Sequence, residues 1–142
     1  MSATEYAAKE LYLLNRPGLR GVQFHGPTML PFLRDRDRLV IRPVDWDQIR
    51  IGDIITYRLE GRFPTCRVAR RTGVELLLKA DNWQQFSATV GPDDVVGKVV
   101  QRERDGRIVS CRHWQWRLYT ARWIVAQRYR GWRASRNSAR AT

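Results

Sequence analysis

Short apolar segments separated by turn residues fill the middle of this 142-residue chain and restrict its possible folds more than any other feature. Strands are predicted at residues 22–24, 39–43, 54–59, 66–69, 74–79 and 95–102. Turns are predicted at Gly61, Gly73 and Gly106. Short strands with turn residues between them are typical of a mainly β domain built from hairpins. The sequence therefore predicts one mainly β core of coiled hairpins.

Helices are predicted at the two ends of the chain. Thr4 can cap a short helix over residues 3–14, which Pro17 and Gly18 would end. A long basic helix is predicted near the C-terminus, where the apolar spacing becomes helical. We divide the chain into an N-terminal helix (1–18), a β domain (19–108), an amphipathic helix (109–134) and a disordered tail (135–142).

The predicted C-terminal helix has two opposite apolar stripes when its residues are placed 100° apart. The first stripe contains Trp114, Leu118, Ala121, Val125, Tyr129 and Trp132, and the second contains Trp116, Tyr119, Trp123 and Ala126. One small domain cannot bury both stripes, so one face is expected to remain exposed for an interaction. We predict that the residues binding a partner or a membrane are Trp116, Tyr119, Arg122, Trp123 and Arg130. The alternative is that both faces are buried between the sheet and its loops.

The positive charge of the chain is concentrated in its C-terminal part. The formal net charge is +12, with eleven arginines and two acidic residues from Gln101 onward. These last residues therefore carry +9 and the first hundred carry only +3. A strongly basic segment favours anionic partners, which include nucleic acid, an acidic membrane surface and an acidic protein.

Cysteine and histidine usage predicts neither a disulfide framework nor a metal site. Cys66 and Cys111 do not form a CxxC pair, and His25 and His113 do not have zinc-ligand spacing. We expect no metal and no cofactor. The polar N-terminus does not resemble a signal peptide, and no segment approaches the roughly 18 apolar residues of a membrane span. We expect a cytoplasmic protein, with peripheral attachment at the inner membrane surface left open.

A possible nucleophile lies in the segment Gly26-Pro27-Thr28-Met29-Leu30-Pro31. Glycine and proline restrict the backbone into a turn, and the hydroxyl of Thr28 lies on that turn. Many hydrolases present a nucleophile in this way, but an ordinary surface turn has the same composition.

Five segments in order resemble the conserved boxes of the signal peptidase I and SOS-repressor peptidase superfamily. They are 26–31 (GPTMLP), 51–57 (IGDIITY), 66–68 (CRV), 79–82 (KADN) and 97–100 (GKVV). Each box is weak alone, and the order and spacing carry the resemblance, which extends from about Val22 to Val100. The chain is most similar to the short members without a membrane anchor. The resemblance implies a signal-peptidase-like β fold.

The resemblance also implies positions for a catalytic site. In the family a serine hydroxyl attacks a peptide carbonyl while a lysine or histidine accepts its proton. Thr28 stands at the nucleophile position and Cys66 at the base position, so both catalytic residues are substituted. The resemblance places the cleft at Met29, Pro31, Asp53, Arg67 and Asp81.

The substitution of the base is the more serious one, because a thiol is a poor general base for an alcohol and is mostly protonated near neutral pH. Three rescues are conceivable: Cys66 itself could attack if Arg67 lowered its pKa, or His25 or Lys79 could act as the base. Arg36 and Ala80 also stand where the family has glycine, and a side chain there can require a different turn.

Three functions are compatible with these residues. The first is a catalytically degenerate binding or structural subunit of a larger complex, whose partner is an acidic or membrane-embedded protein. The second is an active Thr28 peptidase that trims a precursor or leader peptide. The third is nucleic-acid binding through the basic tail. We rank the third last, because the repressor relatives bind DNA through a separate N-terminal domain.

Overall fold

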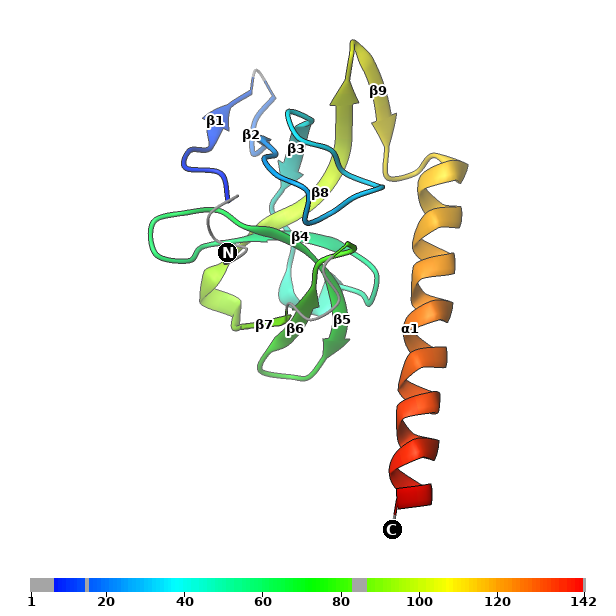
Figure 1. Ribbon diagram of the computed structural model, residues 1–142. Helices are drawn as coiled ribbons and strands as arrows, with labels where there is room; N and C mark the ends of the chain where they lie inside the picture. Colours follow the sequence, from blue (N-terminus) through cyan, green and yellow to red (C-terminus); the bar gives the residue numbers. More distant parts are fainter. Residues whose placement is uncertain (1–6, 15, 83–86, 142) are drawn as a thin grey trace.

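The computed structural model describes residues 7–14, 16–82 and 87–141, and it shows a mainly β protein with a long C-terminal helix (Figure 1). The strands are β1 (Tyr12–Leu13), β2 (Arg20–Gln23), β3 (Arg38–Arg42), β4 (Ile54–Tyr57), β5 (Thr65–Arg71), β6 (Leu76–Lys79), β7 (Ser87–Val90), β8 (Val95–Arg104) and β9 (Arg107–Ser110). Two short 3-10 helices, η2 (Trp46–Gln48) and η3 (Pro92–Asp94), lie in connections, and α1 spans Trp114–Ala141. The prediction of a mainly β fold is confirmed.

The nine strands form one antiparallel sheet in the order β1-β2-β3-β8-β4-β5-β6-β7, and β9 also pairs with β8. β8 is the central strand: Lys98 is opposite Arg42 of β3 on one edge and Ile55 of β4 on the other. Gly97 permits this arrangement, because a Cβ there would lie 2.5 Å from the carbonyl oxygen of Arg42. β8 therefore joins the two halves of the sheet.

The buried apolar residues form two cores. The first core packs residues of β2, β3 and β8 against the 29–33 loop and includes Val22, Met29, Leu33 and Ile41, all 0–1 % exposed. The second core lies among β4, β5, β6 and β7 and is formed by Ile49, Ile55, Tyr57, Cys66, Val68, Leu76, Leu78 and Val90.

Helix α1 lies along one side of the sheet, and its C-terminal end extends beyond the strands (Figure 1). Trp116 and Trp123 are 5 % and 9 % exposed, so they form the face that packs on the β core. The turn at Gly52 lies directly under the helix. A Cβ on Gly52 would approach Thr120 and Ile124 to 2.8 Å, and its φ of +95° also favours glycine. This glycine therefore allows the close approach of the helix.

The predicted N-terminal helix is wrong for the described residues. Ala8 forms a β-bridge with Phe63, whose backbone N–H donates to the Ala8 carbonyl at 2.8 Å, and Tyr12 pairs with Gly21. The segment is extended because the sheet edge provides backbone hydrogen bonds that override its helical apolar spacing. Residues 1–6 of the prediction lie outside the described residues.

The C-terminal boundaries also differ from the prediction. Residues 107–110, which the prediction divides between the β domain and the helix, form β9 and pair with the end of β8. The helix begins at Trp114 and continues to Ala141, so the segment from residue 135, predicted to be disordered, is helical as far as Ala141. No described helix is both long and apolar enough to cross a membrane.

Candidate functional site

The turn that carries Thr28 is fixed at both ends by hydrogen bonds. The N–H of Gly26, which has a φ of +86°, donates to the Asp35 carboxylate at 2.9 Å. Asn82 holds the other side: its backbone N–H donates to the Thr28 carbonyl at 2.9 Å, and its side-chain amide donates to the Pro27 carbonyl at 3.1 Å. Thr28 is 7 % exposed.

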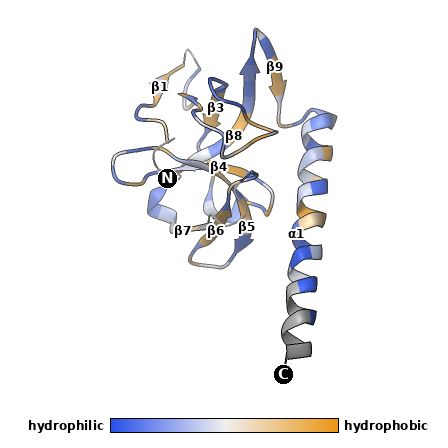
Figure 2. Cartoon of the chain, in the orientation of Figure 1, coloured by the Kyte–Doolittle hydropathy of each residue, from blue (hydrophilic) through white to orange (hydrophobic). Residues whose placement is uncertain are grey.

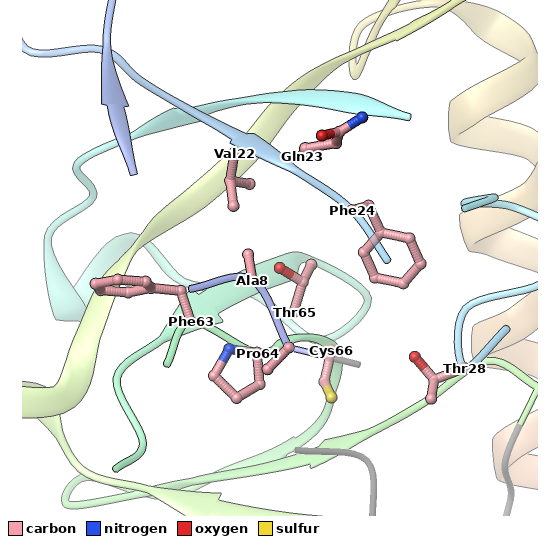
Figure 3. A pocket seen from close by; sticks show the side chains of 10 residues that line it. Ala8, Val22, Gln23, Phe24, Thr28, Phe63, Pro64, Thr65 and Cys66 are labelled. Carbon is pink, nitrogen blue, oxygen red and sulfur yellow. The ribbon is translucent and has the colours of Figure 1, made fainter. Parts of the chain in front are cut away.

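Thr28 and Cys66 line the same small cavity, although 37 residues separate them in the chain (Figure 3). The other lining residues are Ala7, Ala8, Val22, Gln23, Phe24, Phe63, Pro64 and Thr65. The structure thus brings together the two positions at which the resemblance places nucleophile and base. The volume of the cavity is about 10 Å³, which is barely enough for one water molecule. A peptide does not fit into it as it stands.

The thiol of Cys66 is unsuited to either catalytic role. Cys66 is 3 % exposed, and its burial raises the pKa of the thiol from 9.0 to about 12. The nearby Tyr57 hydroxyl lowers the Cys66 pKa and Asp81 raises it, both less than burial does. Burial also raises the pKa of Tyr57. At neutral pH Cys66 is therefore a neutral thiol, neither a base for Thr28 nor a thiolate nucleophile.

This burial predicts a difference in reactivity between the two cysteines. In the native protein at neutral pH, a maleimide should label the half-buried Cys111 and leave Cys66 unmodified, and both should react in denaturant. Intact mass and peptide mapping would measure this. Rapid native labelling of Cys66, retained in Cys111→Ser, would contradict the buried neutral thiol.

The same thiol should affect stability at high pH. Its pKa is higher in the folded protein than in the unfolded chain, so its contribution is complete below about pH 9 and is lost as the pH rises toward 12. Unfolding experiments across this interval should show a steeper loss of stability for wild type than for Cys66→Ala.

The two other candidate bases are not positioned at the cavity. His25 is half exposed, and its Nδ1 lies 3.8 Å from the Asp35 carboxylate. It lines a neighbouring hollow, which shares Ala7, Ala8 and Gln23 with the cavity, and it is not among the residues that line the cavity itself. Lys79 lines a groove beside α1. Among the described residues, neither His25 nor Lys79 therefore supplies Thr28 with a base.

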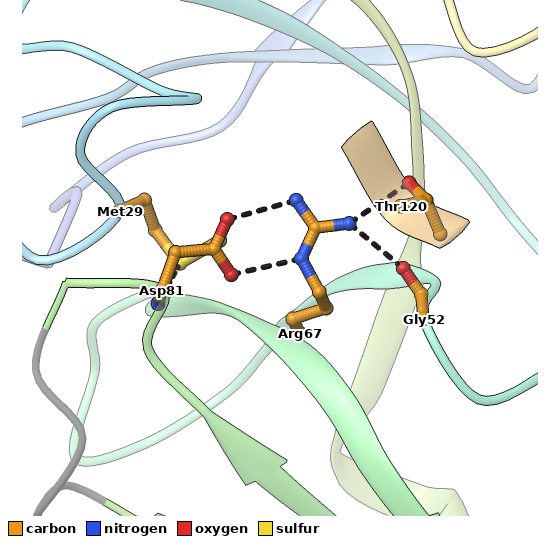
Figure 4. A network of polar contacts seen from close by, with 5 residues as sticks. All are labelled: Met29, Gly52, Arg67, Asp81 and Thr120. Carbon is orange, nitrogen blue, oxygen red and sulfur yellow. Dashed lines mark hydrogen bonds and ion pairs between the residues drawn. The ribbon is translucent and has the colours of Figure 1, made fainter. Parts of the chain in front are cut away.

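Arg67 lies at the centre of a polar network under the helix (Figure 4). Its guanidinium donates two hydrogen bonds to Asp81, at 2.8 and 2.9 Å, and both side chains are fully buried. It also donates to the Gly52 carbonyl at 3.0 Å and to the Thr120 hydroxyl at 3.1 Å. Met29 completes the network, because its sulfur accepts the backbone N–H of Asp81 at 3.3 Å. Arg67 thus connects the loop after β6 to helix α1.

Aromatic rings enclose the same guanidinium. Phe32, Tyr119 and Trp123 have their ring centroids 5.1, 5.3 and 5.5 Å from the Arg67 Cζ atom. Burial, with a further contribution from Asp81, raises the pKa of Tyr119 to about 12. Three of the predicted cleft residues, Met29, Arg67 and Asp81, are therefore buried structural groups rather than a surface open to a substrate.

The remaining predicted cleft residues lie at two other places. The Asp53 carboxylate accepts the backbone N–H of Arg50 at 2.9 Å and lies 3.2 Å from the ammonium of Lys98 on β8. Pro31 is exposed. Asp53 stabilises its own turn and the neighbouring strand.

The two glycine-to-side-chain changes have different consequences for the backbone. Arg36 has a φ of +73°, so an arginine occupies the left-handed conformation that favours glycine. Ala80 is buried and is not among the described residues with positive φ. Arg36 therefore adopts a backbone conformation that is usual for glycine, and Ala80 does not.

The predicted partner-binding residues are divided between two sides of α1. Trp116 and Trp123 are buried and Tyr119 is half-buried, so the prediction that this apolar stripe remains exposed is wrong. The rings of Trp116 and Tyr119 contact the ring of Phe32, and the ring of Trp123 contacts the guanidinium of Arg67. The stripe is buried because it packs on these two side chains. Arg122 and Arg130 are exposed. The exposed apolar side chains belong to the opposite stripe: Trp114, Leu118, Val125, Tyr129 and Trp132.

A groove of about 500 Å³ lies between α1 and strands β5 and β6 and was not predicted. Its apolar lining consists of Ile51, Ala69, Leu77 and Ile124, and its cationic lining of Arg70, Lys79, Arg128 and Arg130. Gln127 and Gly131 complete the described lining, which contains no acidic residue. The basic residues come from β5, β6 and α1. The sequence showed that the helix is basic, but it did not show that residues of the two strands lie beside it.

The described residues contain no group of three His, Cys, Asp or Glu side chains that could hold a metal ion. The structure offers a hydroxyl and a neutral thiol that line one cavity, a cationic groove and an exposed apolar stripe. Comparison of the sequence with protein-family models matched no family, and comparison with curated proteins found no match.

Proposed function

We propose that this chain is a catalytically degenerate, signal-peptidase-like protein that serves as a binding subunit of a larger complex. The observation that carries this proposal is the state of Cys66, which is buried with a raised pKa in the wall of the cavity that Thr28 also lines. General-base assistance typically accelerates such reactions by about 10²–10⁴-fold. Without it the Thr28 hydroxyl keeps only its weak intrinsic reactivity.

The groove beside α1 supports an acidic protein segment as the bound partner. Arg70, Lys79 and Arg128 provide positive charge around an apolar floor that includes Leu77 and Ile124. In a segment that alternates acidic and apolar residues, the carboxylates would pair with these cations and the apolar side chains would pack on the apolar floor. Complementary charge contributes mainly to specificity and to the rate of association.

A defined peptide can test this binding site. A fluorescent peptide of alternating glutamate and leucine should raise its anisotropy on adding the protein, whereas the glutamine–leucine peptide should bind at least about tenfold more weakly. Arg70→Glu combined with Lys79→Glu should remove binding. The control, Arg38→Glu with Arg58→Glu, places the same charge changes on exposed residues outside the groove. Equal loss of binding in both variants would contradict the groove as the site.

The alternative is an active peptidase, and the shared cavity of Thr28 and Cys66 is the observation that favours it. Wild type and Thr28→Ala can be incubated with a mixed peptide library that is then analysed by mass spectrometry. We expect no cleavage by wild type above the Thr28→Ala background. Cleavage that disappears in both Thr28→Ala and Cys66→Ala would overturn the non-catalytic proposal.

A further inference from the structure

The outer face of α1 is an exposed apolar stripe flanked by arginines. We define the outer stripe as Trp114, Leu118, Ala121, Val125, Tyr129 and Trp132. Its five large side chains are 50–67 % exposed, whereas Trp116 and Trp123 on the opposite face are buried. Figure 2 shows apolar and hydrophilic positions along the same helix. At 1.5 Å per residue the outer stripe extends over roughly 27 Å.

Basic residues flank this stripe on both sides. At 100° per residue, Arg117 and Arg128 lie along one border, and Arg122 and Arg133 lie along the other. The sequence of α1 contains seven arginines and no acidic residue. An apolar stripe with cationic borders is the pattern of a helix that lies in the interface of a membrane containing anionic lipids.

The aromatic residues near the end of the helix add a second indication. The Arg136 Cζ atom lies 4.8 Å from the ring centroid of Trp132, and the Arg133 Cζ atom lies 6.0 Å from that of Tyr129. Trp and Tyr rings favour the headgroup region, and arginine can extend along them to keep its charge near phosphates. The stripe is on a single convex helix, which suits a lipid surface better than it suits a protein groove.

We propose that the outer stripe of α1 binds the surface of an anionic lipid bilayer, with the helix lying parallel to the membrane between the lipid and the β core. The apolar side chains would enter the boundary between headgroups and acyl chains, and the flanking arginines would contact lipid phosphates. This surface lies on the opposite side of α1 from the buried tryptophans, and its border meets the acidic-peptide groove at Arg128.

Vesicle flotation with the full chain tests this proposal. Vesicles of phosphatidylglycerol and phosphatidylcholine in equal parts should bind the protein at least about tenfold more tightly than vesicles of phosphatidylcholine alone. Leu118→Ser, Val125→Ser and Trp132→Ser combined should abolish binding. The control, Leu13→Ser with Val74→Ser, removes exposed apolar side chains elsewhere. Circular dichroism should show the same helix content in all these variants.

A charge series tests the arginine borders separately. Arg117→Gln, Arg122→Gln and Arg133→Gln combined should lower affinity for anionic vesicles at least about tenfold. Arg16→Gln, Arg38→Gln and Arg58→Gln remove the same number of exposed charges outside α1 and should have a much smaller effect. Equal affinity for both vesicle types, or binding retained by the stripe variant, would overturn the proposal.

The groove variant separates this proposal from the proposed function. Arg70→Glu with Lys79→Glu should lose the acidic peptide but retain most binding to anionic vesicles, and the stripe variant should show the reverse. If only the groove variant lost vesicle binding, the lipid site would be the groove, and the proposal that the outer stripe binds lipid would be wrong. If the outer stripe bound a purified acidic protein but no vesicles, the lipid proposal would be wrong and the partner would be a protein.

Discussion

Replacing Asp81 with asparagine is expected to lower the free energy of unfolding by about 3–5 kcal/mol, because it leaves the buried guanidinium of Arg67 without a counter-charge. Both side chains are fully buried, and two hydrogen bonds join them. The carbonyl of Gly52 and the hydroxyl of Thr120 still accept hydrogen bonds from Arg67, but neither supplies negative charge. The aromatic rings around Arg67 would stabilise its positive charge only in part.

Guanidinium denaturation followed by circular dichroism measures this change, provided that the transition remains two-state. Asp47→Asn is the matched control, because it also removes a carboxylate beside an arginine. The Asp47 side chain is 97 % exposed and 3.6 Å from Arg71, so this control should change stability by less than about 1 kcal/mol. Similar losses in the two variants would show that burial of the Arg67–Asp81 pair does not determine its effect.

The second large effect is expected at Trp116. Trp116→Ala should lower the free energy of unfolding by about 3–5 kcal/mol, because it leaves a cavity between α1 and the sheet. Trp116 is 5 % exposed and contacts Phe32 edge-to-face, with ring centroids 4.8 Å apart. The matched control is a substitution of Trp114, which lies two residues earlier in the same helix and is 65 % exposed.

Trp114→Ala should change stability by less than about 0.5 kcal/mol, because an exposed side chain loses little packing when truncated. The measurement should again use circular dichroism, because both substitutions alter tryptophan fluorescence. A larger loss for Trp114→Ala than for Trp116→Ala would mean that the helix packs through its other stripe. The pair therefore tests the rotation of α1 about its own axis.

The β core was predictable because its signals are local. The predicted strand at residues 54–59 and the turn at Gly61 coincide with β4 and the turn before β5. The N-terminal segment was not predictable in the same way, since its structure depends on a bridge from Ala8 to Phe63, which is distant in sequence. Local helical spacing contains no information about such a partner.

The rotation of α1 could not be predicted from its own sequence, because both of its stripes are apolar. What selects Trp116 and Trp123 is the surface that they meet, formed by Phe32 and Arg67 on other parts of the chain. Gly52 contributes by leaving room for Thr120 and Ile124. These features are separated in sequence and become one surface only after the sheet has formed.

The candidate site was predicted in part. Thr28 and Cys66 were named together through the resemblance, and the structure places both at one cavity. A mostly protonated thiol at Cys66 was predicted from its ordinary pKa, and the burial that raises this pKa to about 12 became visible only in the structure. The groove was missed because Arg70, Lys79 and Arg128 reach it from β5, β6 and α1, and no spacing in the sequence relates them.

The position of β8 in the sheet has a consequence for synthesis of the chain. β3 and β4 are made early, but each needs β8, which begins at residue 95, as a hydrogen-bonding neighbour. Until the ribosome has released β8, both strands have an open edge, and such edges pair readily with other chains. A nascent chain that stalls before Val95 would therefore be a target for chaperones, whereas the completed chain closes both edges with a single strand.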